Sequence, residues 1–117
     1  MRIERVDPAV PKGWLAGPWN SAVPVSVGFA TQAIDDPHVH DRVTEIFLVA
    51  RGSATARVRS ENVEIGAGDV LFVEPGEPHT FLRASEDALL YVVHAPGLEG
   101  EEASLERRSV LRSELGL

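Results

Sequence analysis

The chain has 117 residues, of which 44% are hydrophobic, and this length accommodates one domain built around one core. It has no cysteine, which excludes disulfides, thiolate nucleophiles and cysteine-type zinc sites. The net charge of −7 argues against nucleic acid or anionic lipid as the main partner, and no apolar run is long enough to cross a bilayer.

Residues 1–22 are predicted to form an extended N-terminal arm, because prolines and glycines recur along this segment and disfavour a helix. The segment lacks the apolar stretch of a signal peptide, so we expect no membrane anchoring and a cytoplasmic location. Trp14 and Trp19 lie within the arm. They either fasten it to the outside of the domain or close the mouth of a site inside it.

Residues 23–95 are predicted to form the core of the domain, and they read as short β-strands. Apolar and polar residues alternate from Val23 to Phe29 and again from Ser53 to Ser60, as on half-buried strands. Glycine, proline and aspartate separate the segments, a pattern typical of a sandwich or barrel. Further strands are expected at 44–51, 63–65, 70–73, 79–83 and 88–94.

Residues 96–117 form the predicted C-terminal tail. The segment 101–115 is rich in glutamate, arginine, serine and leucine, and its leucines fall only loosely on one helical face. We therefore expect a short helix or a mobile tail there.

Four potential metal ligands arrive in an informative order: His38, His40, Glu45 and His79. Residues two apart on a strand project from the same face, so His38 and His40 can point at one position. Glu45 can return beside them on the next strand, and a closed sheet can bring His79 to the same place. Three imidazoles and a carboxylate suit a divalent transition metal rather than a thiolate-selected one.

The residues around these ligands resemble the two motifs of the cupin superfamily. In the first, His38, His40, Glu45 and Gly52 match, while Ala33 stands near the position of the opening glycine. In the second, Gly68, Gly76 and His79 match, while Glu74 replaces a proline and Arg83 replaces an asparagine. Neither set of departures removes a ligand. The resemblance is to a small single-domain cupin of the conserved-barrel type.

This resemblance implies an all-β fold, a double-stranded β-helix or jelly-roll barrel, spanning residues 1–117 as a single domain. It also implies one divalent ion, Fe, Mn, Ni or Zn, held by the four ligands. The chain is then expected to be a metal-dependent enzyme, dioxygenase-like or isomerase-like, acting on a small polar organic molecule. The alternative is a cupin that binds or senses a small ligand without turning it over.

Three residues are candidates for catalytic roles beside the metal. His94 could exchange protons near neutral pH if it faces the barrel interior. Tyr91 lies at the opposite parity of the same predicted strand, so only one of the two can face the metal. Arg83 shares the parity of His79 and could hold a substrate carboxylate, or it could sit at the rim. Ala54 and Ala56 either leave room beside the metal or allow close packing.

Several predicted strands are apolar on both faces, including 46–49, 70–73 and 89–93. A closed barrel buries only one face of each strand, so another surface must cover the outer side. We therefore predict a homodimer that packs sheet against sheet, a state that the cupin resemblance also implies.

Overall fold

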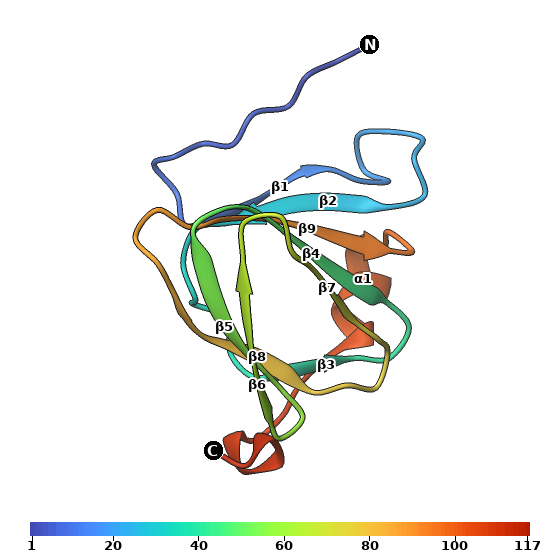
Figure 1. Ribbon diagram of the computed structural model, residues 1–117. Helices are drawn as coiled ribbons and strands as arrows, with labels where there is room; N and C mark the ends of the chain where they lie inside the picture. The colour runs from blue at the N-terminus through green and yellow to red at the C-terminus, as the bar shows by residue number, and fades with distance from the viewer.

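Two antiparallel β-sheets face each other and form a barrel in the computed structural model, which describes residues 1–117 (Figure 1). The first sheet has the strand order β1-β2-β9-β4-β7 and the second has the order β10-β3-β8-β5-β6. This arrangement confirms the prediction of an all-β jelly roll. The strands are β1 (Lys12–Ala16), β2 (Ser26–Ala30), β3 (His38–His40), β4 (Thr44–Arg51), β5 (Ser53–Val58), β6 (Glu61–Gly66), β7 (Val70–Val73), β8 (His79–Ala84), β9 (Leu89–Ala95) and β10 (Arg107–Ser109).

Strands with a clear apolar rhythm begin and end close to where the sequence predicts them. β4 and β7 have the predicted bounds, and β9 is displaced from its prediction by a single residue. Along β4 the buried residues are Glu45, Phe47 and Val49, whereas the residues between them are partly or fully exposed. A period of two therefore places Glu45 on the same face of the strand as the apolar core.

Both ends of the chain contribute a strand that the sequence did not reveal. β1 lies inside the predicted arm and pairs with β2, so part of the arm extends the first sheet. β10 pairs with β3 and places Arg107 opposite His40. Between β9 and β10 lies the helix α1 (Gly100–Glu106), and the chain finishes with a short 3-10 helix, Arg112–Leu115. Neither helix has the length and apolar composition to span a membrane.

The hydrophobic core fills one end of the barrel. It joins Phe47 and Val49 of β4 to Ala54, Ile65 and Leu90 on the neighbouring strands. Ala54 and Ala56 are both buried, and Ala56 stands opposite Phe81. Neither alanine borders the cavities beside the candidate ligands, so their small side chains allow the sheets to approach closely.

Candidate metal centre

His38, His40, Glu45 and His79 converge inside the barrel, and all four side chains are buried. One potential ligand atom from each lies within 4.8 Å of all the others. The Nε2 atom of His79 is 2.6 Å from Oε1 of Glu45, and the Nε2 atoms of His40 and His38 are 3.5 and 3.7 Å from the same oxygen. The sequence expectation that these residues meet at one point agrees with this geometry.

The two sheets share the cluster between them. His38 and His40 lie on β3 and His79 on β8, which are neighbours in the second sheet. Glu45 comes from β4 in the first sheet. His38 and His79 stand directly opposite each other in the antiparallel pair, which explains how residues far apart in sequence reach one position.

Each of the three imidazoles is oriented by a contact at its Nδ1 atom. In His38, Nδ1 is 2.8 Å from the backbone carbonyl of Asp36, and in His79 it is 3.0 Å from that of Glu77. A carbonyl oxygen can only accept a hydrogen bond, so both Nδ1 atoms donate. The other ring nitrogen, Nε2, then faces the cluster in both residues, which is the orientation that a metal ligand requires.

The third imidazole is oriented by a carboxylate from the C-terminal helix. Nδ1 of His40 donates a hydrogen bond to Glu106, the last residue of α1. Glu106 is only 6% exposed. Its other oxygen accepts from the backbone N–H groups of Arg42 and Val43, at 3.4 and 3.3 Å. Carboxylates in this position commonly fix the tautomer and orientation of a metal-binding histidine.

The electrostatics of the cluster hold Glu45 ionised. Burial alone would raise the pKa of Glu45, but the four imidazoles around its carboxylate outweigh burial and hold its pKa well below the usual value. Burial alone would lower the pKa of His40, but hydrogen bonds and charges from Glu45 and Glu106 outweigh it and raise that pKa. The carboxylates thus favour positive charge at the centre.

The donor set fits a divalent cation. The Nε2 atom of His40 is buried without a hydrogen-bond partner, although it points towards the carboxylate of Glu45. A lone pair facing a carboxylate oxygen is unfavourable unless a proton or a metal ion lies between them. The residues present therefore match a mixed nitrogen and oxygen site, and they contain no soft sulfur ligand.

His94 is a fourth imidazole at the edge of the cluster. Its Nε2 atom lies 2.6 Å from Oε2 of Glu45, the carboxylate oxygen that faces away from the other three rings. Its position follows from register, because His94 stands opposite Glu45 in the pairing of β9 with β4. Its ring is also 4.8 Å, centroid to centroid, from that of Trp14. All four histidines of the chain thus gather at this one place.

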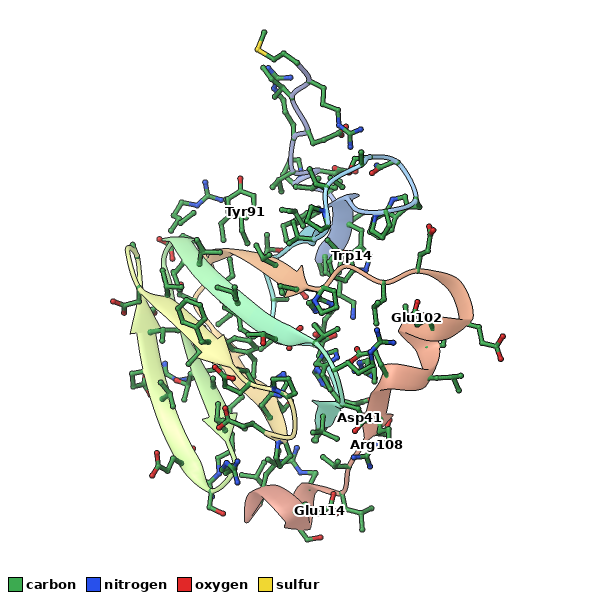
Figure 2. All side chains as sticks on the ribbon, turned by 90° about the vertical axis from the view of Figure 1, so that its right-hand side faces the viewer. Trp14, Asp41, Tyr91, Glu102, Arg108 and Glu114 are labelled. Atoms are coloured by element: carbon green, nitrogen blue, oxygen red, sulfur yellow. The ribbon has the colours of Figure 1, made fainter.

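The structure does not bring Tyr91 or Arg83 to the cluster. Tyr91 lies at the opposite parity from His94, and Figure 2 shows its side chain projecting away from the barrel. Arg83 is exposed and pairs with Glu64 on the outer side of the second sheet. A bulge in β8 causes this, because the register shifts by one residue between Phe81 and Arg83 and reverses the parity.

Two cavities open beside the cluster, and Trp14 borders both. The first, of about 570 Å³, lies within the barrel mouth and is bordered by His38, Glu45 and Phe47. The second, of about 640 Å³, lies between the two tryptophans and α1. His40 and His94 border both cavities, so a molecule in either one can reach the centre. No pattern in the sequence predicts that α1 forms a wall of this cavity.

Comparison with known proteins places this architecture among related barrels. The model of a family described as the cupin domain matches residues 25–95. Streptomyces PAC13 with uridine superposes with a TM-score of 0.68 at 17% identity, over 86% of this chain and 79% of that one. KdgF from a Halomonas species gives a TM-score of 0.62 at 19% identity, over 86% and 88%. A Cupin 2 conserved barrel domain protein from Salinispora arenicola gives 0.64 at 19% identity, over 81% and 88%. No curated protein matches the sequence.

Proposed function

This chain belongs to the cupin domain family, and from that premise we propose that it is a mononuclear metal-dependent enzyme that acts on a small polar organic molecule. One observation carries the proposal: three oriented imidazoles and an ionised carboxylate converge in a buried cluster that borders open cavities. A structural metal site is closed, whereas a catalytic site keeps space for substrate. The uridine bound by a neighbour of the same fold supports a small organic ligand.

His38, His40, Glu45 and His79 would hold the ion, which we propose to be Fe, Mn, Ni or Zn. Bound there, a divalent ion would supply either dioxygen chemistry or polarisation of a substrate carbonyl, the dioxygenase-like and isomerase-like alternatives. The four side chains come from strands rather than loops, so the backbone holds their geometry before any ligand arrives.

His94 is the residue that we propose for proton transfer. It lies outside the group of four ligands but touches Glu45, and it borders both cavities. An imidazole in this position can hold a proton at Nε2 beside Glu45 and exchange it with a bound molecule. Tyr91 and Arg83 have no such access, so we assign them no role in the chemistry.

Metal analysis followed by an activity screen tests this function. Protein purified without added metal is expected to contain a single bound transition-metal ion per chain. Oxygen consumption with small polar substrates then separates the dioxygenase-like reaction from the isomerase-like one, which leaves oxygen unchanged. Protein that binds no metal under any loading condition would refute the proposal. Ligand binding without turnover would establish the alternative, a non-catalytic binding or sensing cupin.

Replacing His94 with asparagine is expected to lower turnover by about a hundredfold or more, because proton transfer by a positioned side chain contributes on that order. Metal content is expected to stay unchanged, since the four ligands remain. The measurement is turnover of the substrate found in the screen, beside metal analysis of the same sample. Loss of the metal together with activity would instead make His94 a ligand.

We also propose that the protein forms a homodimer through the outer face of the first sheet. Leu48, Val70 and Phe72 lie exposed on neighbouring strands, and Phe72 is 58% exposed. Apolar side chains gathered on one face of a sheet commonly mark a contact with a second molecule. A second copy of this chain offers the same face, which allows a two-fold contact.

Light scattering across a dilution series tests the dimer. The wild-type chain is expected to show twice the mass of one chain at micromolar concentration, and Phe72→Glu is expected to show the mass of one chain, because a buried charge opposes the contact. Leu82→Glu is the matched control, since Leu82 is an exposed leucine of β8 in the other sheet. A wild-type protein that remains a monomer would contradict the proposal.

A further inference from the structure

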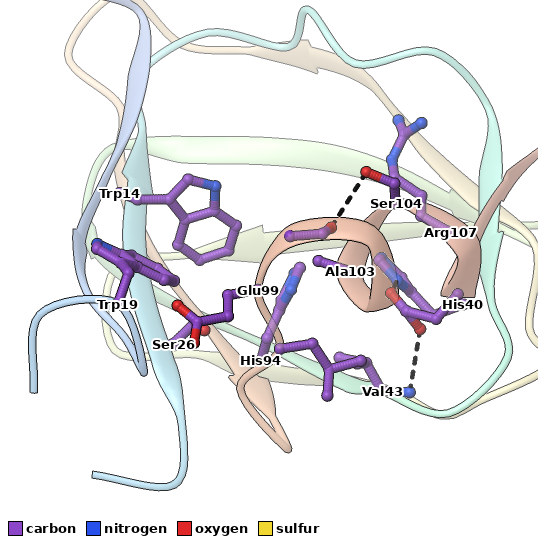
Figure 3. A pocket seen from close by; sticks show the side chains of 13 residues that line it. Trp14, Trp19, Ser26, His40, Val43, His94, Glu99, Ala103, Ser104 and Arg107 are labelled. Carbon is purple, nitrogen blue, oxygen red and sulfur yellow. Dashed lines mark hydrogen bonds and ion pairs between the residues drawn. The ribbon is translucent and has the colours of Figure 1, made fainter. Parts of the chain in front are cut away.

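The larger cavity beside the centre has an aromatic corner at one end. Trp14 and Trp19 lie with their ring centroids 6.1 Å apart and their planes at 73°, so they form two walls that meet (Figure 3). They are 50% and 44% exposed. Each tryptophan would bury more apolar area if it packed fully against the barrel. Both rings instead face a cavity, where a bound molecule would cover their exposed surface.

Each indole ring packs closely against a glycine. A Cβ atom at Gly17 would lie 2.1 Å from the ring of Trp19, and one at Gly28 would lie 2.8 Å from the ring of Trp14. Any larger residue at either position would displace the ring. The corner is therefore formed by the backbone before a ligand binds, which reduces the entropy lost on binding.

The corner is continuous with the candidate metal centre. The ring of His94 lies 4.8 Å from that of Trp14 and 4.9 Å from that of His40, so these aromatic rings form an unbroken row (Figure 3). A ligand placed against the tryptophans thus lies about one ring away from the imidazole that we propose for proton transfer.

A buried hydroxyl without a partner borders the same cavity. Ser26 is 2% exposed, and its Oγ atom makes no hydrogen bond. It stands directly opposite His94 in the pairing of β2 with β9, so both side chains share a face. An unpaired buried hydroxyl is costly, and a polar group of a ligand would satisfy it.

Away from the candidate metal centre, the charges around the cavity disfavour an anion. Glu99 and Glu106 border it, and Arg107, the one arginine or lysine among the bordering residues, is exposed at the edge. An anionic ring would approach two carboxylates while gaining only a solvated arginine. A neutral ring avoids this repulsion and keeps the stacking contact.

From these observations we infer that the Trp14–Trp19 corner is a subsite for a neutral, planar ring carrying a hydrogen-bonding group that reaches Ser26 and His94. The inference rests on the proposed function and narrows it, since it names the class of substrate. The ring stacks on one indole and contacts the edge of the other, while the rest of the molecule extends along His94 to the centre.

Three matched probes test the subsite: nicotinamide, its anionic counterpart nicotinate, and the non-planar cyclohexanecarboxamide. The chain has two tryptophans, so its two indole N–H signals in a nitrogen-15 NMR spectrum report directly on the corner. Nicotinamide is expected to shift both signals. The shifts are expected to saturate at millimolar concentrations of nicotinamide, because so small a ligand binds weakly. Equal or tighter binding of either counterpart would overturn the inference, as would unmoved indole signals.

Variants locate the binding. Trp19→Ala is expected to weaken nicotinamide binding about fivefold through loss of stacking, followed on the Trp14 signal. Ala103→Leu fills the cavity from α1 and is expected to abolish binding, whereas Leu82→Ala, at an exposed position of β8 away from the proposed dimer contact, is expected to leave it unchanged. Binding that survives Ala103→Leu would overturn the subsite.

Metal content is measured on the same samples, so the two proposals fail separately. If nicotinamide binds to a protein that takes up no metal, the proposed metal-dependent enzyme is refuted and the subsite stands. If the metal-loaded protein shows no shift of its indole signals with any of the three probes, the proposed metal centre stands and the subsite is refuted.

Discussion

Replacing His38 with alanine is expected to weaken metal binding sharply while the barrel stays folded. The imidazole supplies one of the four converging ligand atoms, and the three donors left would hold an ion far less tightly than all four. The Nδ1 atom of His38 bonds only to a backbone carbonyl, so removing this imidazole leaves no buried carboxylate without its Nδ1 partner. His40→Ala is a poorer test, because it would leave the buried carboxylate of Glu106 without its imidazole partner.

Thermal unfolding with and without added metal measures this effect. A bound ion stabilises the folded wild-type protein by about 2.7 kcal/mol when its free concentration is a hundredfold above the dissociation constant. The melting temperature of the wild type is therefore expected to rise with metal, and that of His38→Ala is not. Arg83→Ala, an exposed residue paired with Glu64, serves as the control and is expected to respond like the wild type. A variant that binds metal as tightly as the wild type would remove His38 from the ligand set.

Replacing Glu106 with glutamine is expected to weaken metal binding by about 10- to 100-fold, the usual cost of losing a carboxylate that supports a metal-bound histidine. Glutamine keeps the volume of the side chain but removes the negative charge that holds the Nδ1 proton of His40. It also offers only one acceptor oxygen, whereas the carboxylate serves both His40 and the backbone at Arg42 and Val43.

Glu102→Gln is the matched control, because Glu102 lies on the same helix but is exposed and pairs with Arg42. Competition titration against a chelator of known affinity measures the difference between the two variants. Equal affinity for Glu106→Gln and the wild type would mean that Glu106 only fastens the helix to the turn after β3.

The convergence of the four candidate ligands was predictable from sequence because their spacing follows the period of a strand. His38 and His40 share a face by parity, and the apolar rhythm of residues 44–51 defines the strand that carries Glu45. His94 was predictable in part, since its parity on the last strand left two choices and the register with β4 decides between them.

Other features depend on long-range contacts that leave no local pattern. Glu106 differs in no visible way from Glu101 and Glu102, and only the packing of α1 against the β3 end makes it buried. β10 is an Arg-Arg-Ser segment without alternation, and it forms because β3 offers a free edge. The bulge that turns Arg83 outward lies between residues with no glycine or proline to mark it.

The division of the donors between the two sheets has a mechanical consequence. Three imidazoles belong to the sheet of β3 and β8, whereas Glu45 and His94 belong to that of β4 and β9. An ion bound at the centre would therefore cross-link the two halves of the barrel across their interior. Any fluctuation that separates the halves would first have to release a ligand. A bound metal would thus govern how readily the barrel opens, in addition to the chemistry proposed for it.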